Sequence, residues 1–536
     1  MTDEEDRGAS PSTLRICAVV VAIMCPLIAS LLLGAAPAAH AASAGARQEV
    51  PAAEVVQAVK EQLLASHVPA AAVAVVERGA VSIGTVGDGI SASTPFVLGS
   101  MSKSFTAIAV LQLHDAGLVD LDAPVGSYLP EFAGSAAGEG QQDDEHARIT
   151  TRQLLTQTSG LPTSAGLTLI DHPSMSLPER GEAAARTPLA SPPGEAFHYS
   201  NANYAVLGRL VEVVSGQGFG DYVQERIFDS LGMTSSRTSL ASAGRDGLPS
   251  AHTVWFGLSF PRATPDYPGG SPDGFLVSAA TDMATYLTFQ LGDGTWRGER
   301  VLSTASMQLM HAAAVPTEPD TAAAGTDSYA MGWGVGSVDE QPLLAHDGDV
   351  IGYHAEMALL PASSSALVVL TARNGALTDA RAPFARGLAA LAGGALPPIS
   401  GAFTTTYVIV DVTCAAVVFI LAWWLVRPRW RRRLFEQAAK AGPLRAGTLP
   451  MAGYLATAGA LYASVFWGLG VLTVGEPMSL RFAAGFVAPD LTALVLTVCG
   501  ALVVRAVWTA LALWRTARAA RRGAASGVQG PALGAA

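Results

Sequence analysis

The chain has 536 residues and a net charge of −11, and only 14% of its residues are charged, against about 25% in ordinary soluble domains. Residues 401–536 hold 13 of the 33 Lys and Arg but only 4 of the 44 Asp and Glu, so the acidic residues lie mainly before them. This division predicts an exported acidic domain joined to a basic membrane unit, and it argues against nucleic-acid binding because the basic residues lie beside apolar runs.

The first 42 residues predict a targeting segment. Arg15 precedes the apolar run Ile16–Leu33, and small residues follow as far as Ala41. This order resembles a secretory signal that is cleaved after Ala41. Because the run is long and the chain starts with acidic residues, an uncleaved N-terminal anchor is the alternative. Both interpretations export the residues that follow.

The next region, residues 43–400, predicts a single α+β domain. It contains none of the four cysteines, which excludes a disulfide framework, a thiol nucleophile and a cysteine metal site there. Apolar alternation predicts hairpins at 71–86 and 352–372, near the two ends of the region. Helical patterns between them fall at Ser104–Ala116, Thr151–Thr156, Tyr204–Ser215 and Thr281–Leu291. We therefore expect one sheet built from both ends, flanked by helices, with an inserted helical lobe.

The last region, residues 401–536, contains three apolar stretches, each near the ~20 residues that cross a bilayer. We predict transmembrane helices at about 406–426, 451–474 and 484–504. Arginines follow the first and third stretches, and the positive-inside rule places both clusters in the cytoplasm. The expected protein is a multi-pass cell-membrane protein whose 43–400 domain is extracytoplasmic. Arg505 and Asp490, near the third stretch, are expected to snorkel to its edges.

A serine and a lysine lie three residues apart in FVLGSMSKSF, at residues 96–105. If a helix starts at Ser100, Lys103 lies on the same face. A serine hydroxyl is a weak nucleophile until a base removes its proton, and lysine can be that base if its pKa is lowered. Arginine cannot, and a chain with 30 Arg and 3 Lys keeps a lysine here. A capping serine and a solvated lysine would also explain the pair.

Two later motifs place polar side chains at element boundaries. Tyr199 precedes a predicted helix, and a cation such as Lys103 could lower the phenol pKa enough to make it a base. Asn201 offers an amide to a substrate carbonyl or N–H group. His346 and Gly348 end an apolar strand, where glycine lets a ligand approach the backbone and the following N–H groups can face an oxyanion. A core tyrosine, a capping asparagine and a strand-end turn are the structural alternatives.

Together and in this order, the three motifs resemble the serine beta-lactamase and penicillin-binding-protein family. Its members carry Ser-x-x-Lys, then Tyr-x-Asn, then a Lys/His-x-Gly triplet. The resemblance covers about Val50–Ala395 and is strongest to class C beta-lactamase-like peptidases and esterases. TTRQLLTQTSGLP at 150–162 and YAMGWGV at 329–335 support it. It implies a beta-lactamase/transpeptidase-like antiparallel sheet and a reaction that needs no metal or cofactor.

The resemblance implies a catalytic role for three residues. Ser100 is the nucleophile that is acylated, and Lys103 assists its deprotonation. Tyr199 transfers protons between Ser100 and the leaving group or the incoming water. An acyl-enzyme is therefore the expected intermediate.

The resemblance also implies a substrate site made of Asn201, His346, Gly348 and Asp349. The backbone N–H groups of Ser100 and Asp349 would form the oxyanion hole. The triplet reads His-Asp-Gly where beta-lactamases have Lys-Thr-Gly, and Asp347 or Asp349 would repel a substrate carboxylate if turned inward. A D-amino-acid peptide, an amide or an ester therefore fits at least as well as penicillin. Gln157 stands where many relatives carry a histidine, and we attach no function to it.

The expected function is that of a membrane-anchored extracytoplasmic serine hydrolase. Its partners would be membrane lipid and a small-molecule or peptide substrate, such as a cell-wall fragment. One alternative is a sensor that binds penicillin or a cell-wall fragment, but no sizeable cytoplasmic domain follows the predicted spans. The other is a non-catalytic protein that keeps the fold, which the retained Ser100, Lys103, Tyr199 and Asn201 oppose.

Overall fold

The computed structural model describes residues 50–133, 145–317, 325–375, 378–401, 405–426, 443–463 and 489–526. The predicted targeting segment, residues 1–42, lies outside these ranges. The described residues form two compact units, one up to residue 401 and one of helices from residue 405 onward.

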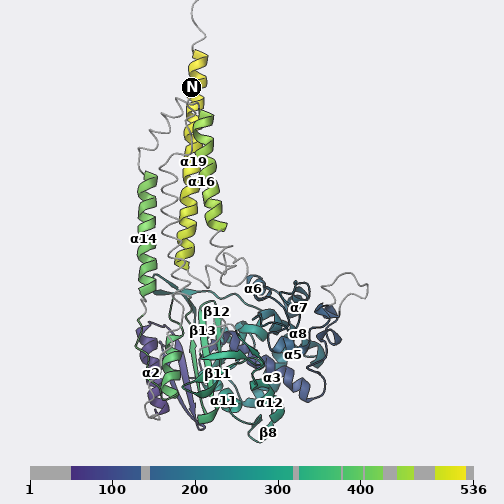
Figure 1. The fold of residues 1–536 in the computed structure, drawn as a ribbon. Coiled ribbons are helices and arrows are strands. Elements are labelled where there is room, and N and C mark those ends of the chain that lie inside the picture. The colour runs from purple at the N-terminus through teal and green to yellow at the C-terminus, as the bar shows by residue number, and fades with distance from the viewer. Residues whose placement is uncertain are drawn as a thin grey trace, which may run out of the picture. The chain divides into compact units, whose positions relative to one another are not determined.

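An eight-stranded antiparallel sheet is the centre of the first unit (Figure 1). In spatial order its strands are β2 (Ala80–Val86), β1 (Ala71–Glu77), β14 (Ser365–Thr371), β13 (Tyr353–Leu360), β12 (Gln341–Val350), β11 (Gly334–Val338), β10 (Thr326–Tyr329) and β9 (Val315–Pro316). Ala71 pairs with Thr371 and Glu77 with Ser365, so β1 lies beside β14. The prediction that both ends of the domain build one sheet is confirmed.

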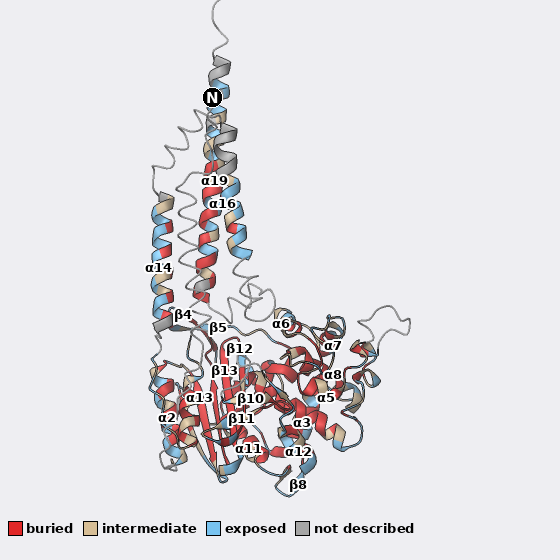
Figure 2. Cartoon of the chain, in the orientation of Figure 1, coloured by how far each residue is buried: buried red, intermediate tan, exposed pale blue. Residues whose placement is uncertain are grey.

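The central strands are buried on both faces (Figure 2). In β1, Ala74 joins the core beneath the helical lobe, whereas its neighbour Val75 packs with α2 (Ala52–Ala65) and α13 (Ala382–Leu391). Successive side chains alternate across a strand, so a strand covered on both faces must be apolar throughout. The sequence AAVAVV meets that requirement.

The helical lobe is inserted between β2 and β9 and covers the other face. Its helices are α3 (Ser102–Asp115), α5 (Thr151–Leu155), α6 (Thr163–Asp171), α7 (Leu177–Ala185), α8 (Asn201–Ser215), α9 (Phe219–Val223), α10 (Leu240–Arg245), α11 (Ala280–Gln290) and α12 (Thr304–His311). Short turns are η1 (Gly99–Met101), η2 (Val125–Ser127), η3 (Pro130–Phe132), η4 (Gln224–Asp229), η5 (Ser271–Phe275) and, between β13 and β14, η6 (Pro361–Ser363). The four predicted helices correspond to α3, α5, α8 and α11.

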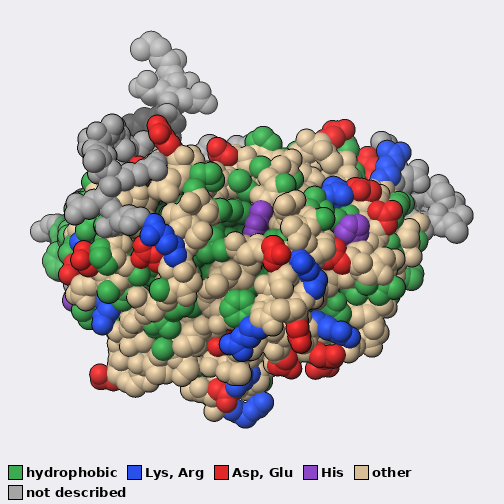
Figure 3. Space-filling model, turned by 90° about the horizontal axis from the view of Figure 1, so that it is seen from below, with side chains coloured by type: hydrophobic (Ala, Val, Ile, Leu, Met, Phe, Trp, Pro, Cys, Tyr) green, Lys and Arg blue, Asp and Glu red, His purple; other side chains and the backbone are tan. Residues whose placement is uncertain are grey.

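Within the described residues, three strand pairs lie outside the main sheet. They are β3 (Pro95–Val97) with β6 (Val277–Ala279), β4 (Ala251–Trp255) with β5 (Leu258–Arg262), and β7 (Thr295–Trp296) with β8 (Glu299–Arg300). Sequence patterns did not predict the β4–β5 hairpin. Figure 3 shows one face of the molecule, where charged side chains of both signs are interspersed with apolar ones.

The second unit consists of α14 (Thr405–Val426), α16 (Pro443–Ala463) and α19 (Pro489–Ser526). Among the described residues, Tyr407–Leu425 and Thr492–Ala519 are long and apolar enough to cross a membrane. Two such helices are present in the described chain, and the third predicted span, 451–474, lies partly outside the described residues and stays a prediction. The predicted middle span started at residue 451, whereas α16 starts eight residues earlier and includes the polar segment RAGT.

The charged residues of α19 are also placed differently from the prediction. Asp490 is 2% exposed and accepts a hydrogen bond from the Tyr407 hydroxyl at 2.7 Å. Arg505 is 3% exposed, and its guanidinium lies 4.1 Å from the centre of the Trp424 ring. Both side chains face neighbouring helices of this unit, so the expectation that they snorkel is wrong.

Candidate active site

The turn before α3 brings Ser100 against the sheet. Gly99 adopts φ +56°, and a Cβ there would lie 2.5 Å from the carbonyl carbon of Gly348. A Cβ on Gly348 would lie 2.0 Å from the carbonyl oxygen of Leu98. Only glycine tolerates either position, because any side chain would collide with backbone that cannot move away. Ser100 therefore lies directly beside strand β12.

Lys103 is completely buried in the first turn of α3. Its Nζ donates hydrogen bonds to Ser100 Oγ at 2.9 Å, to Asn201 Oδ1 at 2.7 Å and to the Asp273 main-chain oxygen at 2.6 Å. Burial lowers the Lys103 pKa to about 7, against the opposing charges of Asp273 and Asp347. A substantial fraction of this amine is then neutral near neutrality and able to accept a proton.

Tyr199 lies close to the same amine. Lys103 Nζ is 5.0 Å from the centre of the Tyr199 ring, and the phenol hydrogen-bonds with Ser100. Burial and the neighbouring Tyr329 raise the Tyr199 pKa well above its usual value, and the hydrogen bond with Ser100 offsets only part of that rise. The prediction that a cation makes this phenol a base near neutrality is therefore wrong.

Asn201 is the first residue of α8, and its side-chain oxygen is held by Lys103. The amide NH2 group is then the end that can donate to a substrate. The start of α8 is held in place by Gln157, whose Oε1 accepts from Ser200 N at 3.0 Å and from Asn203 Nδ2 at 2.5 Å. Gln157, to which no function was attached from the sequence, thus orients the helix that carries Asn201.

His346 is buried on β12 and is neutral at physiological pH. Its Nδ1 lies 2.6 Å from the Asp347 carbonyl oxygen, which can only accept, so Nδ1 carries the proton. Nε2 then accepts from the Tyr329 hydroxyl at 3.4 Å. Burial lowers the His346 pKa to about 4 and outweighs the attraction of Asp347. This residue therefore offers no positive charge to a substrate.

The aspartates beside His346 are each paired with a cation. Asp347 Oδ2 lies 2.5 Å from Arg381 Nη2. Asp349 Oδ1 accepts from His354 Nδ1 at 2.7 Å. Burial acts to lower the His354 pKa, but Asp349 and Glu356 outweigh it and raise the pKa to about 10. His354 is then cationic and balances Asp349, so the repulsion of a substrate carboxylate expected from these aspartates is largely cancelled.

A narrow pocket opens at this point. Its lining includes Ser100, Asn201, Asp273, Asp349 and, on its apolar side, Ile170, Thr264, Tyr267, Gly274, Phe275, Val350 and Ile351. Lys103 hydrogen-bonds Ser100, and Gly348 lies against the turn that contains Ser100. The centres of the Tyr199 and His346 rings lie 6.3 Å apart. The structure thus brings all seven predicted site residues together.

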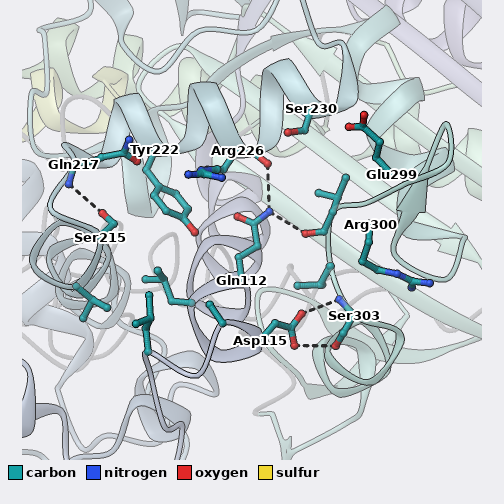
Figure 4. A pocket seen from close by; sticks show the side chains of 16 residues that line it. Gln112, Asp115, Ser215, Gln217, Tyr222, Arg226, Ser230, Glu299, Arg300 and Ser303 are labelled. Atoms are coloured by element: carbon teal, nitrogen blue, oxygen red, sulfur yellow. Dashed lines mark hydrogen bonds between the residues drawn. The ribbon is translucent and has the colours of Figure 1, made fainter.

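A wider pocket lies elsewhere in the helical lobe (Figure 4). It is lined by residues such as Gln112, Tyr222, Arg226, Arg300 and Ser303, and it contains none of the predicted site residues. The chemistry is therefore expected at Ser100.

The sequence profile of the Beta-lactamase family matches residues 55–392, more than half of the chain. The chain belongs to this family of serine hydrolases. Penicillin-binding protein 4 of Amycolatopsis lactamdurans is 32% identical over 348 residues, which cover 62% of this chain and 88% of that protein. Protein flp of Staphylococcus aureus strain N315 is 25% identical, and its match covers 59% of this chain but only 62% of its own length.

Solved structures agree on the fold of this family member. The octameric penicillin-binding protein homologue from Pyrococcus abyssi superposes with a TM-score of 0.52 at 23% identity, over 60% of this chain and 73% of that one. At this identity the likeness concerns the fold alone. It supports the beta-lactamase-like α+β arrangement of the first unit.

One functional contact of this beta-lactamase-family site was missed from the sequence. Arg180 on α7 and Asp273 in η5 form an ion pair at 3.1 Å, and their side chains are 1% and 2% exposed. The pair fixes the turn whose Asp273 carbonyl holds Lys103. No local pattern predicted it, because the partners lie 93 positions apart. Among the described residues, no group of three or more His, Cys, Asp or Glu could hold a metal ion.

Proposed function

We propose that this chain is a membrane-anchored, extracytoplasmic serine hydrolase that cleaves an amide or ester through an acyl-enzyme. The observation that carries the proposal is the hydrogen bond of 2.9 Å from the buried Lys103 amine to Ser100 Oγ. A buried amine with a pKa of about 7 can act as a base at neutral pH, which a solvated lysine or an arginine cannot do.

In the proposed acylation, Ser100 Oγ attacks the substrate carbonyl carbon and its proton passes to the neutral Lys103 Nζ. The proton then moves to the leaving nitrogen or oxygen as its bond to carbon breaks, which leaves the acyl group on Ser100. Tyr199 hydrogen-bonds with Ser100, so its hydroxyl can relay that proton while the phenol stays neutral. Water, deprotonated by the same groups, then hydrolyses the acyl-enzyme.

The oxyanion of the tetrahedral intermediate would be bound by the backbone N–H groups of Ser100 and Asp349. The two glycines support this assignment, because Gly99 and Gly348 let the Ser100 turn and β12 approach to backbone contact. Preorganised N–H donors at such a position are worth about 10²–10³ in rate in other acyl-transfer enzymes. The Asn201 amide would hold the substrate on the adjoining side of the pocket.

We propose a substrate without a carboxylate at the β12 wall, in preference to a penicillin. His346 is neutral and both neighbouring aspartates are already paired, so no free cation faces the substrate from this part of β12. The apolar lining of Ile170, Phe275 and Ile351 favours an apolar acyl group. An ester or a D-amino-acid amide meets both conditions.

The domain limits and the location belong to the same proposal. Residues 1–42 would be a signal or N-terminal anchor, residues 43–400 the hydrolase domain, and residues 401–536 a membrane unit with a third span near 451–474. Its support is the pair of apolar helices in the structure and the arginines that follow residues 426 and 514.

The pH dependence of hydrolysis should report the Lys103 amine. Because the neutral amine is the reactive form, kcat/KM should rise with pH, about tenfold per unit below pH 7, and level off above it. The check is a pH profile of p-nitrophenyl ester hydrolysis by the full-length protein in detergent. An inflection near pH ~10, the ordinary value for a lysine or a phenol, would contradict the assignment of Lys103.

Three chromogenic substrates test the proposed function. The full-length protein and Ser100→Ala would be assayed with a p-nitrophenyl ester, a D-amino-acid anilide and a chromogenic cephalosporin. Ester or anilide turnover by the wild type alone supports the proposal. Stoichiometric cephalosporin binding without turnover would instead favour a penicillin-binding sensor, in keeping with the name of the Amycolatopsis relative. Equal rates for both proteins would refute Ser100 as nucleophile.

A further inference from the structure

The β4–β5 hairpin ends in a cluster of exposed apolar side chains. Phe256, Leu258 and Phe260 are 51%, 52% and 47% exposed. In the described part of the first unit, Phe256 and Phe260 are the only exposed aromatic residues. Trp255 pairs with Leu258 across the hairpin, so these two lie on one face with Phe260. We call these four residues the apolar tip.

The turn of this hairpin is poorly suited to its sequence. Phe256 and Gly257 both have positive φ, +49° and +73°. Such a two-residue turn favours Asn or Gly at the first position, and a bulky residue there is strained. Half of the Phe256 side chain is nevertheless exposed, and its ring lies 6.5 Å from that of Trp255. The turn therefore presents an apolar side chain at a position that its backbone does not favour.

The apolar tip extends from the end of the sheet where the chain leaves the domain. His252 N on β4 donates to Gly352 O at 3.2 Å, and Asn374 N donates to His252 O at 3.1 Å. Arg373, next to Asn374, donates to the Ser66 carbonyl at the end of α2. Gln62 of α2 hydrogen-bonds Ser400 in both directions, at 2.7 and 3.0 Å.

A short stretch of chain joins this end of the sheet to α14. Only four residues separate Ser400 from Thr405, where α14 begins, and the five residue-to-residue steps reach at most about 18 Å. Tyr407–Leu425 of α14 is long and apolar enough to cross a bilayer. If α14 spans the membrane, as the proposed function holds, the sheet end that carries β4 stays close to the lipid surface.

The candidate active site opens at the same end. Thr264 and Tyr267, shortly after β5, line the pocket together with Val350 and Ile351. Asn374, which pairs with β4, also donates to Val350 O at 3.1 Å. The pocket and the apolar tip therefore share one border of the domain (Figure 2 shows β4 and β5 at this end).

We infer that the apolar tip docks into the interface of the lipid bilayer that holds α14. Aromatic and aliphatic side chains at a loop tip partition into the headgroup and acyl boundary. Docking would hold the pocket mouth beside the bilayer, so that it receives an ester or amide whose acyl chain lies in the membrane. This inference rests on the proposed membrane attachment, and its first test below does not depend on catalysis.

A fluorescent label at the tip tests the docking directly. The full-length protein, with its cysteines replaced by serine, would carry NBD at Phe256→Cys and be reconstituted in phosphatidylcholine–phosphatidylglycerol vesicles containing nitroxide-labelled lipid. We expect at least threefold stronger quenching than for NBD at Ser364→Cys, an exposed turn at the opposite end of the sheet. Equal, weak quenching at both sites would overturn docking. An NBD label at Phe256→Cys that is shielded from water but not quenched would also overturn it, because that result indicates a protein partner.

A variant of the tip tests the consequence for substrates. Phe256→Ser/Leu258→Ser/Phe260→Ser should hydrolyse a vesicle-embedded p-nitrophenyl palmitate at least fivefold more slowly, with unchanged turnover of soluble p-nitrophenyl acetate. Unchanged rates on both substrates would overturn the inference. Equal losses on both, with an unchanged thermal midpoint, would mean that the tip serves the pocket itself and would overturn it too. If neither substrate is cleaved by the wild type, the proposed function fails, and the quenching result still decides docking.

Discussion

Replacing Lys103 with arginine should lower kcat/KM by about 10²–10⁴, because the variant keeps the charge but loses the proton acceptor. Burial lowers the pKa of the lysine to about 7, and arginine remains protonated in proteins. The Ser100 hydroxyl would then keep its proton at neutral pH. The measurement is the rate of ester hydrolysis together with the rate of labelling by a fluorophosphonate, which reports acylation alone.

Lys60→Arg is the matched control for this variant. Lys60 lies on α2, away from the pocket lining, and its substitution should change both rates by less than twofold. Because arginine is larger than lysine in a fully buried position, Lys103→Met should be tested beside it. If both Lys103 variants kept wild-type labelling rates, the base would have to be another group.

Replacing Arg180 with methionine should destabilise the domain by about 3–5 kcal/mol, because it leaves the Asp273 carboxylate buried without a partner. Both side chains are almost completely buried, so solvent cannot compensate for the lost charge. The midpoint of urea unfolding, followed by intrinsic fluorescence of the full-length protein in detergent, measures the loss. An effect below ~1 kcal/mol would show that the pair contributes little.

The double variant Arg180→Met/Asp273→Asn separates stability from positioning. Removing both charges together should restore most of the stability, since a buried pair gains little over neutral groups of similar size. The Asp273 charge raises the Lys103 pKa, so its removal should move the midpoint of the pH profile to lower pH. An unmoved midpoint in a stable double variant would limit this pair to a structural role.

The Ser100–Lys103 contact at the centre of the candidate site could be predicted from local spacing. Ser100 and Lys103 lie one turn apart on a helix, and that spacing alone places Nζ within hydrogen-bond reach of Oγ. The hairpins near the two ends of the domain were predictable for a similar reason, because the alternation of apolar and polar residues along a strand is a local sequence pattern. The position of Asn201 could be predicted because it lies at the start of a helix.

The electrostatic state of the site could not be predicted in this way. The neutral His346 and the raised pKa of Tyr199 arise from burial by residues distant in sequence. The Arg180–Asp273 pair joins two elements of the lobe across 93 positions, and an arginine in an alanine-rich helix gives no hint of it. Of the three predicted spans, the described residues contain two apolar helices, at Tyr407–Leu425 and Thr492–Ala519, and the predicted middle span runs beyond the described residues.

The most direct test of the account is the site of acylation. The full-length protein would be incubated with a fluorophosphonate, digested and analysed by mass spectrometry. We predict one adduct per chain, on the Ser100 hydroxyl, formed faster as the pH rises through about 7 and absent in Ser100→Ala. An adduct on any other residue, or equal labelling of wild type and Ser100→Ala, would contradict the central claim that Ser100 is the nucleophile.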